Sequence, residues 1–474
     1  MMDVVMRMPD LSTVDETVTL IRWLAEVGQV IQRGDPLLEV ETDKAILVVE
    51  SAVAGTLQSI AVPAGSEVAT GQPIATFDAG EKVASRAGDT PVTDDTGGPI
   101  AGAAGITPGG AELGAIRQPE SGFTTPSSGD HRSFFARNRG ARGTAPAVSE
   151  ARTASSEYPR EFLMDLYQRM VMIREFEEGV KFLFLEGSMP GTIHQCQGQE
   201  ATAVGVCAAL KEGDFITSTF RGHGHALAKG LTPEELLFEL FGAVTGCCRG
   251  KGGSMHVGNM AKGMVPGIAI VGGGVPLATG MALAFKMRKE SRVVACFFGD
   301  GAIAEGAFHE GVNLAAIWDL PVLFVCENNL YGASTRVDRV MRNDRIADRA
   351  AAYGIRGETV DGNDVVAVYE AARSAAAECR TGHGPVLLEL LTYRRTGHSR
   401  RDACHYQPKD EREQWLRRDP IDRLGQFLRD RGLADPEALD RVRSEVQARF
   451  EAAVEAARRQ PLPTLEDLTT DVIA

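Results

Sequence analysis

The sequence predicts an all-β barrel or sandwich, a flexible linker, and an α/β domain whose parallel sheet carries helices on both faces. Three observations predict this organisation. Short apolar strands and Gly turns repeat every 37 residues within positions 1–79, and Ala, Gly, Thr, Pro and Ser dominate positions 79–130. Beyond position 157, long helical periodicities alternate with short continuous apolar runs. Such runs are typical of parallel strands buried on both faces.

The N-terminal domain, residues 1–79, is predicted from its internal repeat. Four residues of the first half recur 37 positions later: Leu20, Gly28, Gly34 and Pro36 at Leu57, Gly65, Gly71 and Pro73. The halves contain apolar strands at 18–24, 37–40, 56–62 and 74–77, and an even set of short strands predicts a two-sheet barrel or sandwich. Between the halves lies Glu41-Thr42-Asp43-Lys44-Ala45, which symmetry places at a hairpin tip with Lys44 facing solvent.

Residues 80–156 are predicted to form a flexible linker. They hold few aromatic or branched apolar side chains, so burial cannot offset the entropy lost on ordering them. A short basic segment at 131–142 belongs to this solvated stretch. We therefore expect the N-terminal domain to be tethered rather than fixed.

The third part, residues 157–474, is predicted to be the α/β domain. Apolar residues recur at helical spacing over 157–186 and 365–379. Continuous apolar strands are predicted at 292–298, 321–327 and 385–391. The last 60 residues, rich in Arg, Glu and Ala, are expected to form peripheral helices.

Composition excludes several classes of partner. The 50 Lys and Arg against 64 Asp and Glu give a formal charge of −14, which argues against a nucleic acid or an acidic membrane surface. The eight Cys form no CxxC pair, which fits a reducing compartment. No apolar run approaches the ~18 residues of a membrane span, and no signal-peptide core follows the N-terminus. We expect a cytoplasmic protein.

The strongest functional signal lies where two predicted neighbouring strands end. Gly299-Asp300-Gly301 follows one strand, and Asn328-Asn329 follows the next. Ligands of parallel sheets bind at the carboxyl ends of strands. A carboxylate with an amide oxygen suits Mg²⁺ bridging phosphate oxygens. Gly301 and Ala302 are expected to open a helix whose free N–H groups face a diphosphate.

With these motifs the sequence resembles the alpha subunit of the thiamine-diphosphate-dependent first component of 2-oxo acid dehydrogenases, a family that includes pyruvate, branched-chain and acetoin dehydrogenases. The resemblance covers residues from about 157 to 430. Its further blocks are Gly191-Thr192-Ile193-His194, Gly198-Gln199-Glu200-Ala201, Arg221-Gly222-His223-Gly224, Lys251-Gly252-Gly253-Ser254-Met255-His256, Ile270-Val271-Gly272 with Val275-Pro276, residues 327–332, and Tyr393-Arg394 with Gly397-His398-Ser399.

The resemblance implies the site residues. The Mg²⁺ ligands would be Asp300, Asn329 and, through its carbonyl, Tyr331. The diphosphate contacts would be Arg221, Gly301, Ala302 and His398, and the backbone contacts to the aminopyrimidine ring Ala269 and Val271. The catalytic groups would be His194, His223 and His398, whose imidazoles can donate to a carboxylate or exchange a proton near pH 7. For His256 and His309 the sequence leaves two interpretations open, a role in the site and packing in the core.

Two positions depart from the family pattern. Phe220 stands where many relatives have Tyr, which would remove a hydroxyl contact to the diphosphate. Ala304 stands where Asn is frequent after the Gly-Asp-Gly motif. These departures affect fine substrate contacts rather than the Mg²⁺ site. Ser399 stands at the position where some relatives of the family are phosphorylated, and it is interpreted as a structural loop residue. Cys247-Cys248 is interpreted as a packing pair.

The resemblance also implies partners. Activation of the cofactor needs a carboxylate against pyrimidine N1′, and the ~270 matching residues make up only one parallel-sheet domain. A beta subunit would therefore supply the Glu, in an α2β2 assembly. Residues 1–79 resemble a lipoyl domain, since Asp43-Lys44-Ala45 stands where biotinyl relatives carry Met-Lys-Met. Lys44 would carry the lipoyl group, and the dihydrolipoyl acyltransferase and dihydrolipoyl dehydrogenase components would be further partners.

The implied activity is oxidative decarboxylation of a small 2-oxo acid, pyruvate first, with acyl transfer to lipoamide. Acetoin and branched-chain 2-oxo acids stay open as substrates, because the pocket would be shared with the partner. The alternative from another class is a lipoyl carrier whose α/β domain only scaffolds the assembly. The set of Asp300, Asn329, Arg221 and His398 favours the enzyme.

Overall fold

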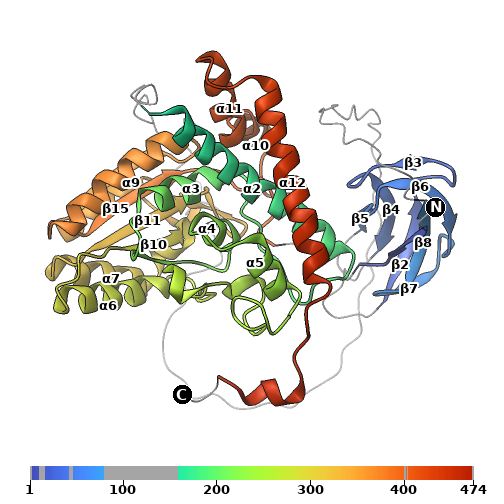
Figure 1. Ribbon diagram of the computed structural model, residues 1–474, viewed down its shortest axis with the longest axis horizontal. Helices are drawn as coiled ribbons and strands as arrows, with labels where there is room; N and C mark the ends of the chain where they lie inside the picture. The colour runs from blue at the N-terminus through green and yellow to red at the C-terminus, as the bar shows by residue number, and fades with distance from the viewer. Residues whose placement is uncertain are drawn as a thin grey trace, which may run out of the picture. The chain divides into compact units, whose positions relative to one another are not determined.

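The computed structural model describes residues 3–9, 17–41, 46–78, 158–399, 402 and 404–471 (Figure 1). The predicted linker, residues 80–156, lies outside the described residues, and so does Lys44. In the described ranges, no helix combines the length and the apolar character that crossing a bilayer requires.

The N-terminal domain consists of two four-stranded antiparallel sheets. One has the order β1 (Asp3–Arg7), β8 (Pro73–Asp78), β6 (Gly55–Ile60), β3 (Val30–Ile31). The other has the order β5 (Ile46–Glu50), β4 (Pro36–Glu41), β2 (Thr17–Trp23), β7 (Glu67–Ala69). Leu20, Leu37, Leu57, Ile74 and Phe77 belong to the fully buried core of this domain. The predicted all-β fold is confirmed.

The sequence repeat corresponds to a pseudo-twofold hydrogen-bond pattern. The Gly28 amide donates to the carbonyl of Leu57 at 2.7 Å, and the Gly65 amide donates to the carbonyl of Leu20 at 2.6 Å. Both glycines have positive φ, +91° and +84°, a conformation in which a Cβ would be strained. The equivalent glycines and leucines of the two halves therefore connect the halves to each other.

The α/β domain is built on a five-stranded parallel sheet. The strand order is β14 (Arg356–Asp361), β15 (Val386–Leu391), β11 (Val322–Asn328), β10 (Val294–Gly299), β9 (Phe215–Thr217). A short hairpin of β12 (Tyr331–Gly332) and β13 (Thr335–Arg336) follows β11. The three predicted strands correspond to β10, β11 and β15, with boundaries within two residues.

Helices cover both faces of the sheet because alternate strand residues enter two cores. Ala295 and Phe297 of β10 join the core beneath α2 (Arg160–Leu185), α3 (Glu200–Ala209) and α9 (Val365–Arg380). Val294, Cys296 and Phe298 join the opposite core beneath α6 (Gly274–Met287) and α7 (Gly306–Ile317). Within the described ranges of this domain, the other α-helices are α4 (His223–Ala228), α5 (Pro233–Leu240), α8 (Val337–Val340), α10 (Lys409–Leu416), α11 (Pro420–Asp430) and α12 (Pro436–Ala457).

The segment after β10 differs from the prediction in one detail. Residues Asp300–Ala304 form a 3₁₀ turn, and α7 begins only at Gly306. The predicted helix opening at Gly301 is therefore a tight turn. Asp300 stands at its first position, directly at the carboxyl end of β10.

Candidate active site

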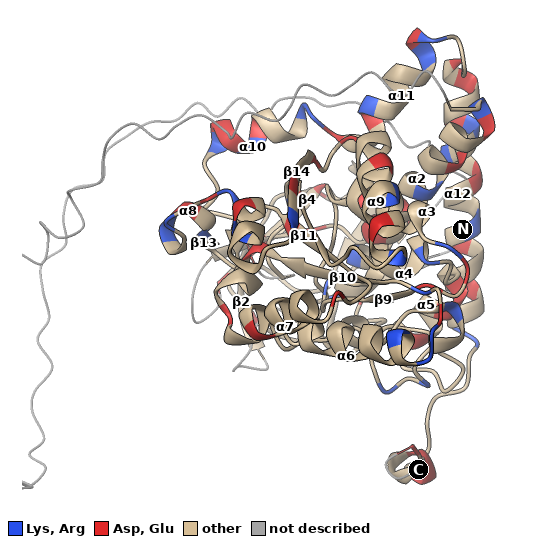
Figure 2. Cartoon of the chain, turned by 90° about the vertical axis from the view of Figure 1, so that its left-hand side faces the viewer, with Lys and Arg blue, Asp and Glu red and all other residues tan. Residues whose placement is uncertain are grey.

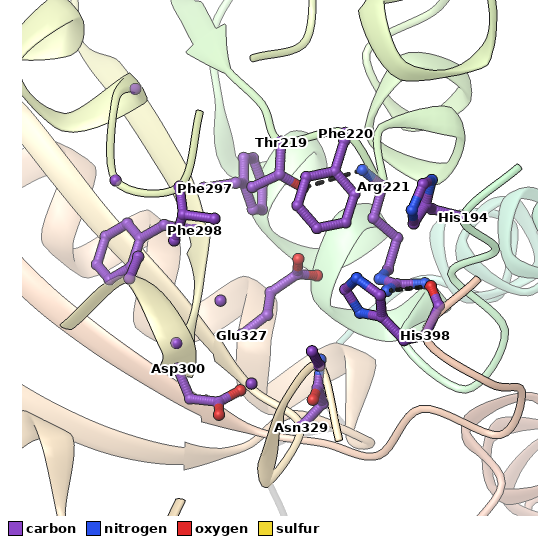
Figure 3. Close-up of a pocket in the computed structure, with 18 of the residues that line it drawn as sticks. His194, Thr219, Phe220, Arg221, Phe297, Phe298, Asp300, Glu327, Asn329 and His398 are labelled. Atoms are coloured by element: carbon purple, nitrogen blue, oxygen red, sulfur yellow. Dashed lines mark hydrogen bonds between the residues drawn. The ribbon is translucent and has the colours of Figure 1, made fainter. Parts of the chain in front are cut away.

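A cavity of about 640 Å³ lies at the carboxyl ends of β10 and β11 (Figure 3). Residues of the segments 218–221, 268–274, 331–335 and 394–398 also line it, together with His194, Gln199, Met255 and Val340. Ten residues predicted from the sequence line it: His194, Arg221, Ala269, Val271, Asp300, Gly301, Ala302, Asn329, Tyr331 and His398. The fold thus brings together residues that lie up to about 200 positions apart in the chain.

One end of the cavity presents oxygen ligands. Asp300 is only 3% exposed, and its Oδ1 has no hydrogen-bond partner among the described residues. Burial raises the pKa of this carboxyl to about 6. Asn329 donates to Gln199 Oε1 at 2.9 Å and accepts the Tyr331 amide through its own side-chain oxygen at 3.2 Å. A buried carboxylate that forms no ion pair among the described residues, beside an amide oxygen, fits a hard divalent cation.

Two buried guanidinium groups lie in the same wall. Arg221 donates to the carbonyls of Gln195 and, at 3.0 Å, His398. Burial lowers the pKa of Arg221 to about 10. Arg394, 1% exposed, donates to the carbonyl of Ala333 at 2.9 Å. Among the described residues neither group forms an ion pair with a carboxylate. Two such cations suit a diphosphate, because charge-assisted bonds to phosphate oxygens would compensate their burial.

Two imidazoles stand beside Arg221 (Figure 3). The ring centroids of His194 and His398 are 5.4 Å apart, and Phe220 lies within 4.8 and 5.6 Å of them. Burial, helped by the charge of Arg221, lowers the pKa of His194 to about 3 and that of His398 to about 4. Each Nδ1 lacks a hydrogen-bond partner among the described residues. Both rings are therefore neutral at pH 7, and each has a ring nitrogen free to form a hydrogen bond with a ligand.

His223 is placed differently from the prediction, because it does not line the cavity. Its ring is fully buried at the start of α4. Nδ1 lies 3.2 Å from a carboxylate oxygen of Glu177, and Nε2 lies 3.0 Å from the Ser254 hydroxyl. The first turn of α4 directs the side chain toward α2, so His223 belongs to the layer behind the cavity wall.

The two histidines left open by the sequence also lie outside the cavity wall. His256 bonds through Nδ1 to the carbonyl of Gly267 at 2.7 Å. His309 is exposed and bonded to the Tyr353 hydroxyl. Both rings are held by neighbouring protein groups.

Arg394 and Glu327 are cavity residues to which the sequence analysis assigns no role. Glu327, 4% exposed, accepts from the Thr202 hydroxyl and lies 3.3 Å from Nε2 of His225. Burial opposes its ionisation, but His225 and Thr202 together hold the pKa of Glu327 below its ordinary value. In the sequence, Glu327 stands out as the one charged residue at the end of an apolar strand. Arg394 stands out by its place between Tyr393 and the Gly397-His398-Ser399 block.

The two depressed imidazole pKa values predict acid sensitivity of the α/β domain. In the unfolded chain both rings have a pKa of about 6.5, so the unfolded state binds more protons between about pH 6.5 and the folded values. Stability from this source is complete above about pH 6.5 and falls as the pH drops toward 4. The melting temperature should therefore fall less steeply between pH 7 and 5 in His194→Gln than in the wild type. The exposed His405→Gln serves as control; an unchanged slope in His194→Gln would refute the assignment.

Comparison with known proteins shows the family of each domain. Residues 168–466 match the family described as dehydrogenase E1 component, and residues 4–77 match the one described as biotin-requiring enzyme. The acetoin:2,6-dichlorophenolindophenol oxidoreductase alpha subunit of Bacillus subtilis is 48% identical over 308 residues, 65% of this chain and 92% of that protein. The corresponding alpha subunit of Cupriavidus necator is 43% identical over 321 residues, which cover 68% of this chain and 96% of that protein. The pyruvate dehydrogenase E1 component alpha subunit of Rhizobium meliloti is 40% identical over 319 residues, which cover 67% of this chain and 92% of that protein. The chain therefore belongs to the dehydrogenase E1 component family and carries an N-terminal domain of the biotin and lipoyl type.

Proposed function

We propose that this chain is the alpha subunit of a 2-oxo acid dehydrogenase that uses thiamine diphosphate and Mg²⁺ to decarboxylate pyruvate oxidatively, with acyl transfer to lipoamide. The observation that carries the proposal is the charge arrangement of the cavity. An unpartnered Asp300 oxygen stands at one end, and the buried Arg221 and Arg394 lie in the same wall without carboxylate partners. A diphosphate with its cation compensates both.

The cofactor, when bound, supplies the nucleophile and the electron sink for decarboxylation. The cavity residues would have different roles around it. Asp300, Asn329 and the Tyr331 carbonyl would hold Mg²⁺. Arg221 and Arg394 would bind phosphate oxygens and fix their orientation. The imidazoles of His194 and His398, which are neutral at pH 7, would donate hydrogen bonds to the substrate oxygens.

A lipoyl group on Lys44 is the proposed acyl acceptor. It would be carried on the connection between β4 and β5, whose residues Glu41 and Ile46 pair directly. Tethering the domain to the catalytic chain would raise its effective concentration at the cavity to roughly the millimolar range. In the alternative, the chain is a lipoyl carrier and its α/β domain is only a scaffold for the assembly. This alternative does not explain the charged groups of the cavity.

A beta subunit is proposed to cover the open side of the cavity and supply the activating Glu, in an α2β2 assembly. Ile270 and Val271, which line the cavity, are 76% and 47% exposed. Leu277 and Met287 extend this apolar surface along α6, with 42% and 75% exposed. The ribbons of α6 and α7 are coloured mostly as residues other than Lys, Arg, Asp and Glu (Figure 2). Dihydrolipoyl acyltransferase and dihydrolipoyl dehydrogenase components complete the proposed complex, in the cytoplasm.

A substrate comparison tests the proposed reaction. The chain, assembled with its beta subunit, is assayed with pyruvate, 3-methyl-2-oxobutanoate and acetoin, with 2,6-dichlorophenolindophenol as electron acceptor. We expect kcat/KM for pyruvate to exceed the others by about tenfold, which corresponds to roughly 1.4 kcal/mol of discrimination. Acetoin is the second candidate, because the two acetoin relatives described above are 48% and 43% identical. A preference for acetoin would replace pyruvate with that substrate.

A further inference from the structure

Glu239, near the end of α5, holds a loop that no part of the proposed function explains. The residue is 0% exposed. One carboxylate oxygen accepts the amides of Cys248 and Gly250 at 2.8 and 2.9 Å. The other accepts the amides of Gly252 and Gly253 at 2.8 and 3.0 Å. Within the described residues no Lys or Arg forms an ion pair with Glu239. Four backbone N–H groups are therefore the hydrogen-bond partners of this buried carboxyl group.

The loop wraps closely around this carboxylate. A Cβ added at Gly246 would lie 2.5 Å from the Glu239 carboxylate and 2.6 Å from its backbone. Gly246 therefore allows an approach that any other residue would prevent. We call residues 246–253 the clamped loop.

The clamped loop leads directly into the cavity wall. The next residue, Ser254, contacts Nε2 of the buried His223 at 3.0 Å, and Met255 lines the cavity. His256 then donates through Nδ1 to the carbonyl of Gly267 at 2.7 Å, and the Gly267 amide donates to Val257 at 3.0 Å. Residues 268–271, which follow Gly267, form the wall expected to face the aminopyrimidine ring. The Mg²⁺ end of the cavity is instead built on β10 and β11.

We propose that Glu239 is a positioning residue, which through the clamped loop sets the cavity wall at 268–271 and so the affinity for the organic part of the cofactor. The inference rests on the proposed function for the identity of the ligand, but the clamp itself is a property of the chain alone. Its distinctive consequence is that loss of Glu239 weakens binding of thiamine diphosphate while the anion and Mg²⁺ end stays intact.

The chain contains its own reporter of the clamp. Six of its eight cysteines are buried, and only Cys247 and Cys248, both in the clamped loop, are partly exposed. Labelling of native thiols by 5,5′-dithiobis(2-nitrobenzoate), with peptide mapping, therefore measures loop opening without any cofactor. Losing charge-assisted bonds should speed labelling of these two thiols about tenfold in Glu239→Gln. Glu234→Gln, on the same helix and half-exposed, is the matched control and should match the wild type.

The second arm measures binding by the chain assembled with its beta subunit. In Glu239→Gln the Kd for thiamine diphosphate should rise about tenfold, while the Kd for inorganic diphosphate with Mg²⁺ changes less than about twofold. Gly246→Ala keeps the carboxylate but displaces the loop, so it should reproduce both effects. A wild type that fails to bind thiamine diphosphate would refute the proposed function, and thiol labelling would still decide the clamp.

Three results would overturn the inference. These are unchanged labelling in Glu239→Gln and Gly246→Ala, faster labelling with unchanged thiamine diphosphate affinity, or an equal loss for inorganic diphosphate. Should both variants fail to fold, hydrogen exchange of the wild type decides. The amides of 248–253 are expected to exchange at least about tenfold more slowly than an unbonded loop; rapid exchange would contradict the clamp.

Discussion

Asp300→Asn should make the chain more stable without ligands and should abolish its cofactor-dependent turnover. Burial raises the pKa of Asp300 to about 6, so folding at pH 7 keeps ionised a group that its surroundings disfavour. The difference between a pKa of 3.8 in the unfolded chain and about 6 in the folded chain corresponds to roughly 3 kcal/mol, of which we expect an amide to recover about 1–2 kcal/mol. The same substitution removes the carboxylate that Mg²⁺ requires, and turnover should fall about a thousandfold.

The stability gained by Asp300→Asn should depend on pH. The folded pKa of the carboxyl lies above the unfolded value, so its contribution is most favourable below about pH 3.8 and is lost as the pH rises through about 6. The stability gained by Asp300→Asn should therefore be largest near pH 8 and vanish near pH 4, as measured by denaturant unfolding.

The effect of Mg²⁺ and thiamine diphosphate on the melting temperature also distinguishes Asp300→Asn from the wild type. Mg²⁺ with thiamine diphosphate should raise the melting temperature of the wild type and leave that of Asp300→Asn unchanged. Asp344→Asn, at an exposed position, is the control for removing a charge. Lower stability of Asp300→Asn at pH 8, or unchanged turnover, would mean that Asp300 is an ordinary structural carboxylate.

Lys44→Arg should eliminate acylation of this chain while leaving decarboxylation intact. Lys44 is the only Lys among residues 1–79, so it is the only side chain of that domain able to form the amide bond to a lipoyl group. Arg keeps the positive charge but cannot form that amide. Pyruvate oxidation with 2,6-dichlorophenolindophenol should stay at the wild-type rate, because an artificial acceptor bypasses the arm.

Intact-protein mass spectrometry measures the loss directly. The wild type, expressed with a lipoylation system, should gain one lipoyl group and, with pyruvate and beta subunit, one acetyl group on it. Lys44→Arg should show neither, and Lys82→Arg, just beyond the domain, should show both. A lipoyl mass that persists in Lys44→Arg would place the modification elsewhere, and dye-coupled activity lost with Lys44 would contradict a separate carrier role.

The sequence predicted the fold well where one pattern sets both backbone and burial. Strands β10, β11 and β15 are mostly apolar, every residue of β11 and β15 is buried, and most of their apolar side chains lie in one of the two cores. The Gly28 and Gly65 turns were found because each half of the repeat confirms the other. The linker and Lys44 lie outside the described residues and stay predictions.

The site was less predictable where side-chain direction depends on tertiary packing. His223 belongs to the same block as Arg221, yet the start of α4 turns its ring toward Glu177 instead of the cavity. Arg394 and Glu327 needed the structure, because nothing local shows that an Arg in a loop and a Glu ending a strand meet in one cavity. The clamp by Glu239 likewise consists of bonds to backbone amides, which carry no side-chain signature.

Calorimetric titration of thiamine diphosphate into the chain assembled with its beta subunit tests the central claim most directly. With Mg²⁺ present, one cofactor should bind per alpha chain, and binding should be lost both after Mg²⁺ depletion and in Asp300→Asn. Absence of binding in the wild type, or binding indifferent to Mg²⁺ and to Asp300, would contradict the assignment of this cavity.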